Sequence, residues 1–192
     1  GRVFDALDDQ NIADDTLVIY TSDHGMSLGQ HGFWGHGEDT WPSNTHREAN
    51  NIPMIIRPPG KRNEGKVQQS LVGTTDIFAT ILDYAGLPSP TPEKMHSRSM
   101  RSLIEEDAPE WGDAVFKEQE ETRTIRTADW LLMRRYGPTS FEFTDELYDL
   151  RNDPDERQNV IDKAEHADEL NVLVARLDDF FDTYSNPKWN LW

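Results

Sequence analysis

Hydrophobic and polar residues follow two different patterns along the chain, and the change falls near residue 105. Before it, residues 16–21 and 52–57 are continuous apolar runs rich in β-branched side chains, which suit strands covered on both faces of a parallel sheet. Residues 1–12 and 75–85 instead repeat apolar residues at helical spacing. Strands and helices in this arrangement predict an α/β fold.

After residue 105 the apolar residues come in shorter pieces. Four of them have the pattern and the turn signals of strands, at residues 114–118, 123–127, 130–135 and 146–150. Residues 162–182 then repeat leucines, valines and phenylalanines along one helical face. We therefore predict a small antiparallel sheet with a C-terminal helix.

Three intervening segments complete the expected layout. Residues 25–51 lack periodicity and are predicted to form a long loop, a kind of segment that is usually functional or disordered. Residues 67–72 are expected to form a short strand, and 88–110 a Pro-rich linker with one helical turn near 100–104. These boundaries divide the chain into a part of an α/β domain, 1–105, and a small α+β subdomain, 106–192.

Composition excludes several classes of protein. The 192 residues carry a formal net charge of −17, which disfavours binding to nucleic acid or to an anionic membrane surface. No apolar run approaches the ~20 residues that span a bilayer. Cysteine is absent, so the chain has no disulfides and no thiolate metal site. An upstream export signal would place the protein in the periplasm or outside the cell, but the compartment stays open.

Candidate chemistry begins where the first apolar run ends, at Ser22-Asp23-His24-Gly25. In open α/β sheets, ligands bind beyond the carboxyl ends of strands. The carboxylate of Asp23 and the imidazole of His24 can both bind a divalent cation. Gly25 allows a sharp turn after them. Taken alone, the tetrapeptide fits two interpretations equally well: a cation site, or a helix-capping aspartate followed by a surface histidine.

The residues that follow resemble a known family. Residues 23–35 resemble the pattern Asp-His-Gly, two residues, Leu-Gly-Glu-His-Gly, one residue, Trp of type I sulfatases, in the alkaline phosphatase superfamily. Residues 52–60, 75–88 and 146–159 resemble further blocks of that family in the same order. The last block reads Glu-Leu-Tyr-Asp-Leu, followed by Asp-Pro, Glu and Asn. The resemblance implies the C-terminal part of an alkaline-phosphatase-like α/β/α sandwich, followed by the small subdomain.

The resemblance also implies a sulfuric ester hydrolase with a metal. Sulfatases of this type bind one divalent cation, usually Ca²⁺, and Asp23 and His24 match two of its ligands, with His24 where many members have Asn. The nucleophile is a formylglycine made from Cys or Ser in a Cys/Ser-x-Pro-x-Arg motif, which this chain lacks. A nearby cation lowers the pKa of such a nucleophile and stabilises the charge of the transition state.

His36 departs from the family pattern. Members usually have a Lys there, two residues after the Trp, in contact with the sulfate. A histidine can donate a hydrogen bond and carries charge only below its pKa. We expect His36 to bind the sulfate and to act as the catalytic proton donor; an ordinary loop histidine is the alternative.

Four more residues are candidate substrate contacts. Trp41 can stack on a sugar, and Arg47 suits a second sulfate or a carboxylate. His46 lies beside Arg47 in the loop, and Arg123 is a candidate in the small subdomain. His31 matches a recurrent family position, with an expected supporting role. The expected substrate is a sulfate ester, small or polymeric, of a carbohydrate.

Two rival functions stay open. Relatives that hydrolyse phosphate or phosphonate monoesters share the Asp-His-Gly strand, and a non-catalytic binding protein could keep the fold. His36 in the place of the usual Lys, and the absence of the nucleophile motif, motivate the second rival.

The resemblance predicts that the reading frame upstream of Gly1 encodes Cys or Ser followed by x-Pro-x-Arg, so the 192 residues alone should not turn over substrate. Sequencing the DNA before the Gly1 codon tests this prediction. A frame that continues without the motif would remove the formylglycine mechanism and leave the two rivals.

Overall fold

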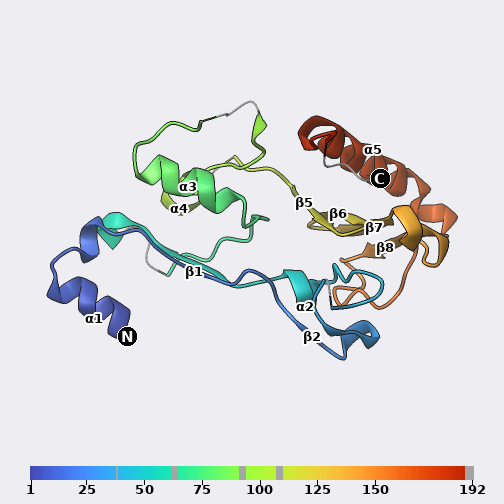
Figure 1. Ribbon diagram of the computed structural model, residues 1–192, viewed down its shortest axis with the longest axis horizontal. Helices are drawn as coiled ribbons and strands as arrows, with labels where there is room; N and C mark the ends of the chain where they lie inside the picture. Colours follow the sequence, from blue (N-terminus) through green and yellow to red (C-terminus); the bar gives the residue numbers. More distant parts are fainter. Residues whose placement is uncertain (38, 62–64, 91–93, 107–109, 189–192) are drawn as a thin grey trace. The chain divides into compact units, whose positions relative to one another are not determined.

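The computed structural model describes residues 1–37, 39–61, 65–90, 94–106 and 110–188, drawn in Figure 1. They form two compact units: the first comprises Gly1–Ser22 and Pro53–Gly112, and the second Asp23–Ile52 and Asp113–Trp192. The predicted boundary at residue 105 lies near one junction. Residues 23–52 differ from the prediction, because they group with the second unit. Each unit is described by itself.

The two apolar runs of the first unit form paired strands. β1 (Val18–Thr21) lies antiparallel to β4 (Met54–Arg57), with Thr21 opposite Met54. The parallel arrangement that these apolar runs suggested is not found for this pair, whose hydrogen bonds follow an antiparallel register. Among the described residues, these two strands pair only with each other. Tyr20 and Ile55 are exposed, so one face of the pair is not covered by the part of the chain that is described.

The predicted helices of the first unit are present, with ends that shift by one to three residues. They are α1 (Arg2–Asp9), α3 (Asp76–Tyr84) and α4 (Arg101–Glu105), with short 3-10 turns at η1 (Ala13–Asp15) and η3 (Pro59–Lys61). The Asp76 carboxylate begins α3 by accepting hydrogen bonds from the backbone N–H groups of Gly73 at 3.0 Å and Arg98 at 2.8 Å. Both bonds satisfy donors that a helix start or turn would otherwise leave open.

The strand predicted at residues 67–72 is wrong, since the structure shows no strand there. The side-chain oxygen of Gln68 accepts from the backbone N–H groups of Gln69 and Ser70, and the Leu71 carbonyl accepts from the Trp111 indole at 2.8 Å. These side chains satisfy backbone groups that a strand would have paired with a neighbouring strand. Val67 is exposed, so no buried face favours a strand.

The second unit contains the predicted antiparallel sheet. Its strands are hydrogen-bonded in chain order: β5 (Ala114–Gln119), β6 (Thr122–Thr127), β7 (Trp130–Arg135) and β8 (Glu146–Asp149). Short turns suffice between such strands, because antiparallel neighbours need no crossover. The turn η6 (Ala164–His166) leads into α5 (Ala167–Tyr184), which lies over the sheet in Figure 1. The predicted sheet with a C-terminal helix is therefore confirmed.

The two faces of this sheet differ chemically, because side chains alternate along each strand. On the face that packs on α5, which we call the helix face, the core includes Phe116, Ile125, Leu132, Leu147, Leu173 and Leu177. On the opposite face, Lys117, Thr124 and Arg135 hydrogen-bond to Asn50, Thr45 and Ser43 of the 23–52 segment. We call this the loop face. None of the helices in the described ranges has the length and apolar character to cross a bilayer.

The long loop predicted at residues 25–51 carries short regular elements. β2 (Ser27–Leu28) pairs with β3 (Trp34–Gly35) across the turn η2 (Gln30–Gly32), and α2 (Arg47–Asn50) ends the segment. The fully buried Asn44 ties these parts together. Its amide donates to Ser27 Oγ at 2.7 Å and accepts from the His46 backbone N–H at 3.0 Å. A further turn, η5 (Gly137–Phe141), follows β7.

Leu177→Ala is expected to lower the free energy of unfolding by about 2–5 kcal/mol, because the Leu177 side chain is 0% exposed and its loss leaves a cavity under the sheet. The matched control is Val172→Ala in the same helix, 56% exposed, which should cost about 0.5 kcal/mol or less. Urea unfolding followed by tryptophan fluorescence measures both, and equal midpoints would contradict the assigned core.

Candidate functional site

Asp23 and His24 follow β1 and form the first part of the site. The His24 backbone N–H donates to Asp23 Oδ1 at 3.0 Å, and His24 Nδ1 lies 2.8 Å from the Gly25 carbonyl oxygen. A carbonyl oxygen only accepts, so in the neutral ring Nδ1 carries the proton and Nε2 has the lone pair. Nε2 lies 3.8 Å from Asp23 Oδ2. The ring is thus oriented with its electron-donating nitrogen toward the carboxylate.

Gly25 fixes where these two side chains begin. Its backbone N–H donates to the Ala49 carbonyl at 2.9 Å, which joins the turn to α2. A Cβ at this position would lie 2.1 Å from the Glu48 carbonyl oxygen, far inside van der Waals contact. The chain can approach α2 this closely only with glycine. The motif Asp-His-Gly is therefore a packing requirement as well as a donor set.

His36 lies against His24. The two rings are stacked, with centroids 3.6 Å apart and planes 22° from parallel. His36 Nε2 is 3.2 Å from Asp39 Oδ2, and the Asp39 backbone N–H donates to the His36 carbonyl at 2.7 Å. The predicted metal residues and the predicted catalytic histidine therefore come together. We call Asp23, His24 and His36 the Asp-His-His cluster.

The chemistry of these donors fits a divalent cation. A carboxylate oxygen and an imidazole nitrogen 3.8 Å apart can share one ion, and a second-sphere bond from Nδ1 to a carbonyl is the usual way to orient a ligating histidine. The Asp23 side chain is 85% exposed, so it faces outward from the described residues. Calcium takes six to eight ligands, mostly oxygens, so two donors form only part of its site.

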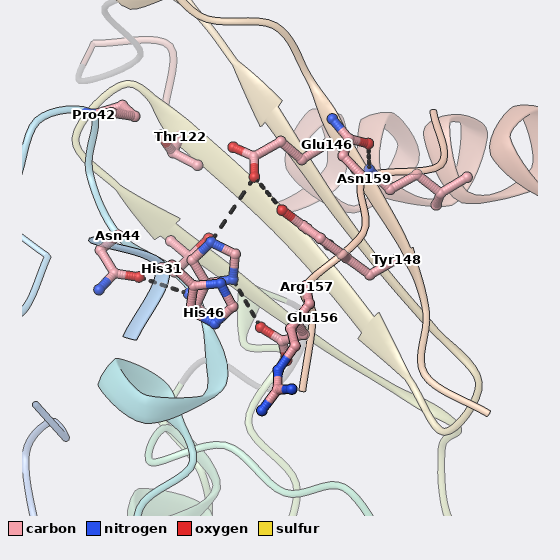
Figure 2. Close-up of polar contacts among 12 residues, drawn as sticks. His31, Pro42, Asn44, His46, Thr122, Glu146, Tyr148, Glu156, Arg157 and Asn159 are labelled. Carbon is pink, nitrogen blue, oxygen red and sulfur yellow. Dashed lines mark hydrogen bonds and ion pairs between the residues drawn. The ribbon is translucent and has the colours of Figure 1, made fainter. Parts of the chain in front are cut away.

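His46 and Glu156 form a second, buried cluster, which Figure 2 shows on the loop face. His46 Nδ1 is 2.9 Å from Glu156 Oε2, and its Nε2 is 3.9 Å from Glu146 Oε2. Glu156, 0% exposed, also accepts from the Arg126 guanidinium at 2.6 Å and the Arg47 backbone N–H at 3.1 Å. Burial alone would raise the pKa of Glu156, but the His46 and Arg126 contacts outweigh it and hold that pKa below its usual range.

This geometry gives no support to His46 as a substrate contact. Its side chain is 3% exposed and its nitrogens face two carboxylates. His31 stacks on it with centroids 3.7 Å apart, and burial first, then the neighbouring His46, lowers the pKa of His31. His31, His46 and Glu156 have metal-binding atoms within 4.8 Å of one another. Arg126 already neutralises Glu156, so a cation there would meet a like charge, and the cluster is better explained as a structural one.

Arg47 and Arg123 are also bound within the fold. Arg47 Nη1 donates to the Pro154 carbonyl and to Asp155 Oδ1, which ties α2 to the turn after β8. Arg123 is 7% exposed on the helix face, where Nε donates to Glu118 at 2.6 Å and the guanidinium lies 4.3 Å from the Phe181 ring centre. The Asp-His-His cluster belongs to the segment on the opposite face. The predicted role of Arg123 in substrate binding therefore has no support.

Trp41 keeps the exposure that its predicted role requires. Its side chain is 56% exposed, and its indole N–H donates to Glu142 at 3.2 Å. The ring meets Phe143 edge-on, with centroids 6.0 Å apart. These contacts hold one edge of the indole and fix its orientation.

Sequence reasoning missed Glu156 as the buried carboxylate that binds His46 and Arg47 of the 23–52 segment. It stands in the last motif block, Asp-Pro, one residue, Glu, two residues, Asn, and that spacing was the signal. Asn159 has a similar role: its side-chain oxygen accepts from the backbone N–H groups of Leu147 and Ile161, each at 3.0 Å. The block therefore closes the turn after β8 and places Glu156 under the loop.

Comparisons with known proteins agree with this fold. Residues 37–182 match the family model described as N-sulphoglucosamine sulphohydrolase, C-terminal. The chain is 28% identical over 191 residues to an N-acetylglucosamine-6-O-sulfatase of Bacteroides thetaiotaomicron, an alignment that covers 93% of this chain and 32% of that protein. The chain thus spans about a third of the length of this relative.

Two solved structures extend the likeness. One is a protein in complex with its substrate D-glucosamine-2-N,6-O-disulfate, with a TM-score of 0.81 and 26% identity, covering 99% of this chain and 39% of that one. The other is the phosphonate monoester hydrolase of Agrobacterium radiobacter, with a TM-score of 0.74 and 25% identity, covering 95% and 38%. The predicted fold class is confirmed over nearly the whole chain.

Glu156→Gln is expected to lower the free energy of unfolding at pH 7 by about 3 kcal/mol, because it removes the buried charge that pairs with the partly buried Arg126 and with His46. The folded-state pKa of Glu156 is depressed, so its stabilisation is present above its unfolded pKa, near 4.5, and is lost as the pH falls through the folded value. The difference between wild type and variant should therefore shrink below about pH 4.

The control is Asp155→Asn, whose exposed pair with Arg47 should contribute about 1 kcal/mol or less. Urea midpoints measured from pH 3 to pH 8 decide the matter. If both variants lose the same free energy of unfolding at pH 7, the buried pairing of Glu156 contributes no more to stability than the exposed pair of Asp155.

Proposed function

This chain belongs to the sulfatase family of the alkaline phosphatase superfamily, and on that basis we propose that the intact protein hydrolyses sulfate esters of carbohydrates. The observation that carries the proposal is the Asp-His-His cluster, in which a carboxylate, an oriented imidazole and a second imidazole lie together after β1. Relatives named for sulfated glucosamine substrates support the carbohydrate class.

Asp23 and His24 are the residues of this chain that would hold a divalent cation, for which we propose Ca²⁺. When bound, the cation would stabilise negative charge on the sulfate oxygens and favour ionisation of a formylglycine hydrate supplied from upstream. The His24 tautomer, set by the contact of Nδ1 with the Gly25 carbonyl, leaves the lone pair on Nε2, the nitrogen that would bind the ion. Gly25 keeps both ligands at a fixed distance from α2.

His36 is the proposed proton donor. Hydrolysis breaks the bond between sulfur and the sugar oxygen, the sulfur gains an oxygen that derives from water, and the sugar oxygen takes a proton. A protonated His36 can give that proton from its ring, and the contact of Nε2 with Asp39 Oδ2, at 3.2 Å, orients the ring. The stack on His24 restricts the rotation of the His36 ring, so the proton donor keeps one orientation.

Substrate recognition is assigned mainly to Trp41. An exposed indole held at one edge presents a flat apolar surface on which a sugar ring can stack. Arg47 is partly exposed beside Asp155 and could contact a second anionic group only by giving up part of that pair. The proposal therefore includes a sugar-binding surface at Trp41, with no second sulfate site required.

A phosphonate or phosphate monoester hydrolase is the second candidate. The likeness to the Agrobacterium enzyme, at a similar TM-score, favours it, because both reactions need a cation and a proton donor at a tetrahedral anion. The two candidates differ in the reacting atom, which is sulfur in one and phosphorus in the other. Sulfate and phosphonate monoesters each carry one negative charge, whereas a phosphate monoester carries two when fully ionised. Comparison of matched nitrophenyl esters separates them.

For the intact protein we expect Ca²⁺-dependent hydrolysis of nitrophenyl sulfate with a kcat/KM above that for the matched phosphate and phosphonate esters. His36→Ala should reduce kcat/KM at least about a hundredfold, because a positioned acid contributes on that order. The thermal midpoint should change little, since His36 is partly exposed.

His36→Gln serves as the companion variant, since it keeps a hydrogen-bond donor without an ionisable proton. It should recover KM more than kcat. Wild-type kinetics in both variants would remove His36 from the reaction, and a preference for phosphonate esters would favour the second candidate.

A further inference from the structure

Lys117 is a cation of the loop face for which the reaction described so far has no use. It lies in β5 opposite Thr124 of β6, and its ammonium group donates a hydrogen bond to the side-chain oxygen of Asn50 in α2. The side chain is partly buried. Asn50 is a neutral amide, so it satisfies one of the three ammonium protons and none of the charge.

Other buried or partly buried cations of this unit are paired with carboxylates. Arg123 pairs with Glu118, Arg135 with Glu146 and Arg126 with Glu156. Lys117 forms no such pair with any carboxylate in the described ranges of the chain, although the protein has 36 acidic residues. In a chain with a net charge of −17, an unpaired cation under a loop needs an explanation other than an excess of positive charge.

The absence of a carboxylate has a measurable consequence. Burial lowers the pKa of Lys117 to about 8, because the charged form loses hydration and gains no counter-charge. An anion that reached the ammonium group would repay this loss and raise the pKa again. The site therefore has an unmet preference for negative charge.

Contacts on both sides of Lys117 lead to the stacked rings of His24 and His36. On one side, Asn50 follows Ala49, whose carbonyl accepts the Gly25 N–H directly after His24. On the other side, Gln119, two residues along the same strand and on the same face, packs against Gly37, directly after His36. A Cβ on Gly37 would lie 2.6 Å from the Gln119 side chain. Lys117 is thus bracketed by the backbone supports of the stack.

We propose that Lys117 binds an oxyanion at the Asp-His-His cluster, and that this oxyanion is the sulfate group of the substrate. The inference rests on the proposed function for the identity of the anion. A fixed ammonium group between the backbone supports of the stacked histidines would supply positive charge that does not depend on the protonation of His36. Lysine suits this task because a compact charge with three donors can follow an oxygen of a tetrahedral anion from several directions.

The first test needs no substitution. In the intact protein, the reactivity of the Lys117 amine toward acetic anhydride is followed by peptide mass spectrometry from pH 6 to pH 11. We expect a pKa near 8 in chloride buffer and a higher value, with slower labelling at each pH, in saturating inorganic sulfate at equal ionic strength. The exposed Lys163 serves as the internal reference. A Lys117 profile that is the same in chloride and sulfate would overturn the proposal.

The second test uses Lys117→Met and Lys117→Arg, with Lys163→Met as the matched control. Loss of a charged hydrogen bond to the substrate should lower kcat/KM for nitrophenyl sulfate by about tenfold or more in Lys117→Met and weaken inhibition by inorganic sulfate to a similar extent. Lys117→Arg should retain part of both, because it keeps the charge. If Lys117→Met fails to fold, the arginine variant and the labelling still decide.

The outcomes separate the two proposals. Sulfatase activity that is unchanged in both Lys117 variants leaves the proposed function standing and removes Lys117 from the site. Sulfate-sensitive labelling of Lys117 in a protein that hydrolyses only phosphonate esters supports an oxyanion site and overturns sulfate as the substrate group.

Discussion

The arrangement of the second unit depends on one buried carboxylate. Glu156 is fully buried and accepts hydrogen bonds from the His46 ring, the Arg47 backbone N–H and the Arg126 guanidinium. His46 lies 110 residues before Glu156 in the sequence, so these bonds join distant segments. A charge in that position must be paired or the segment would open to water. The Arg47 N–H that bonds to Glu156 belongs to the first residue of α2, and the Ala49 carbonyl of α2 accepts the Gly25 N–H. Two hydrogen bonds therefore connect Glu156, through α2, to the turn that carries Asp23 and His24.

The secondary structure of the small sheet was accessible from the sequence, because alternation and turn signals act locally. Strand β7 begins and ends where predicted, and α5 differs mainly at its start, where η6 takes the first turn. The Asp-His-Gly motif was found from its resemblance to a family pattern. Gly25 was expected to allow a sharp turn, and the structure adds a close backbone approach to Glu48 that only glycine permits.

Other features could not be predicted, since they depend on which face or which partner a side chain meets. Arg123 and Arg126 look alike in the sequence, yet one lies under α5 and the other holds Glu156. His46 is a residue type that often binds ligands, but its side chain is buried like that of a core residue. Residues 67–72 begin and end with apolar residues, as a short strand can, but the Gln68 side chain bonds to the backbone N–H groups of Gln69 and Ser70. For Arg123, Arg126 and His46 a partner of the side chain comes from a distant segment, and a single sequence does not show which distant segments come together.

The two faces of the sheet allow different kinds of evolutionary change. The helix face holds an apolar core, whereas the loop face combines the apolar cluster of Leu131, Met133 and Tyr148 with the polar side chains that meet the 23–52 segment. Substitutions among Leu132, Leu147 and Leu177 alter the cohesion of the sheet and α5, whereas substitutions among the residues that meet the 23–52 segment alter polar contacts around the candidate site. A lineage can therefore vary the polar contacts of the loop face while the apolar core under α5 is maintained. Directed evolution of a new specificity would begin with a library confined to the polar positions of the loop face.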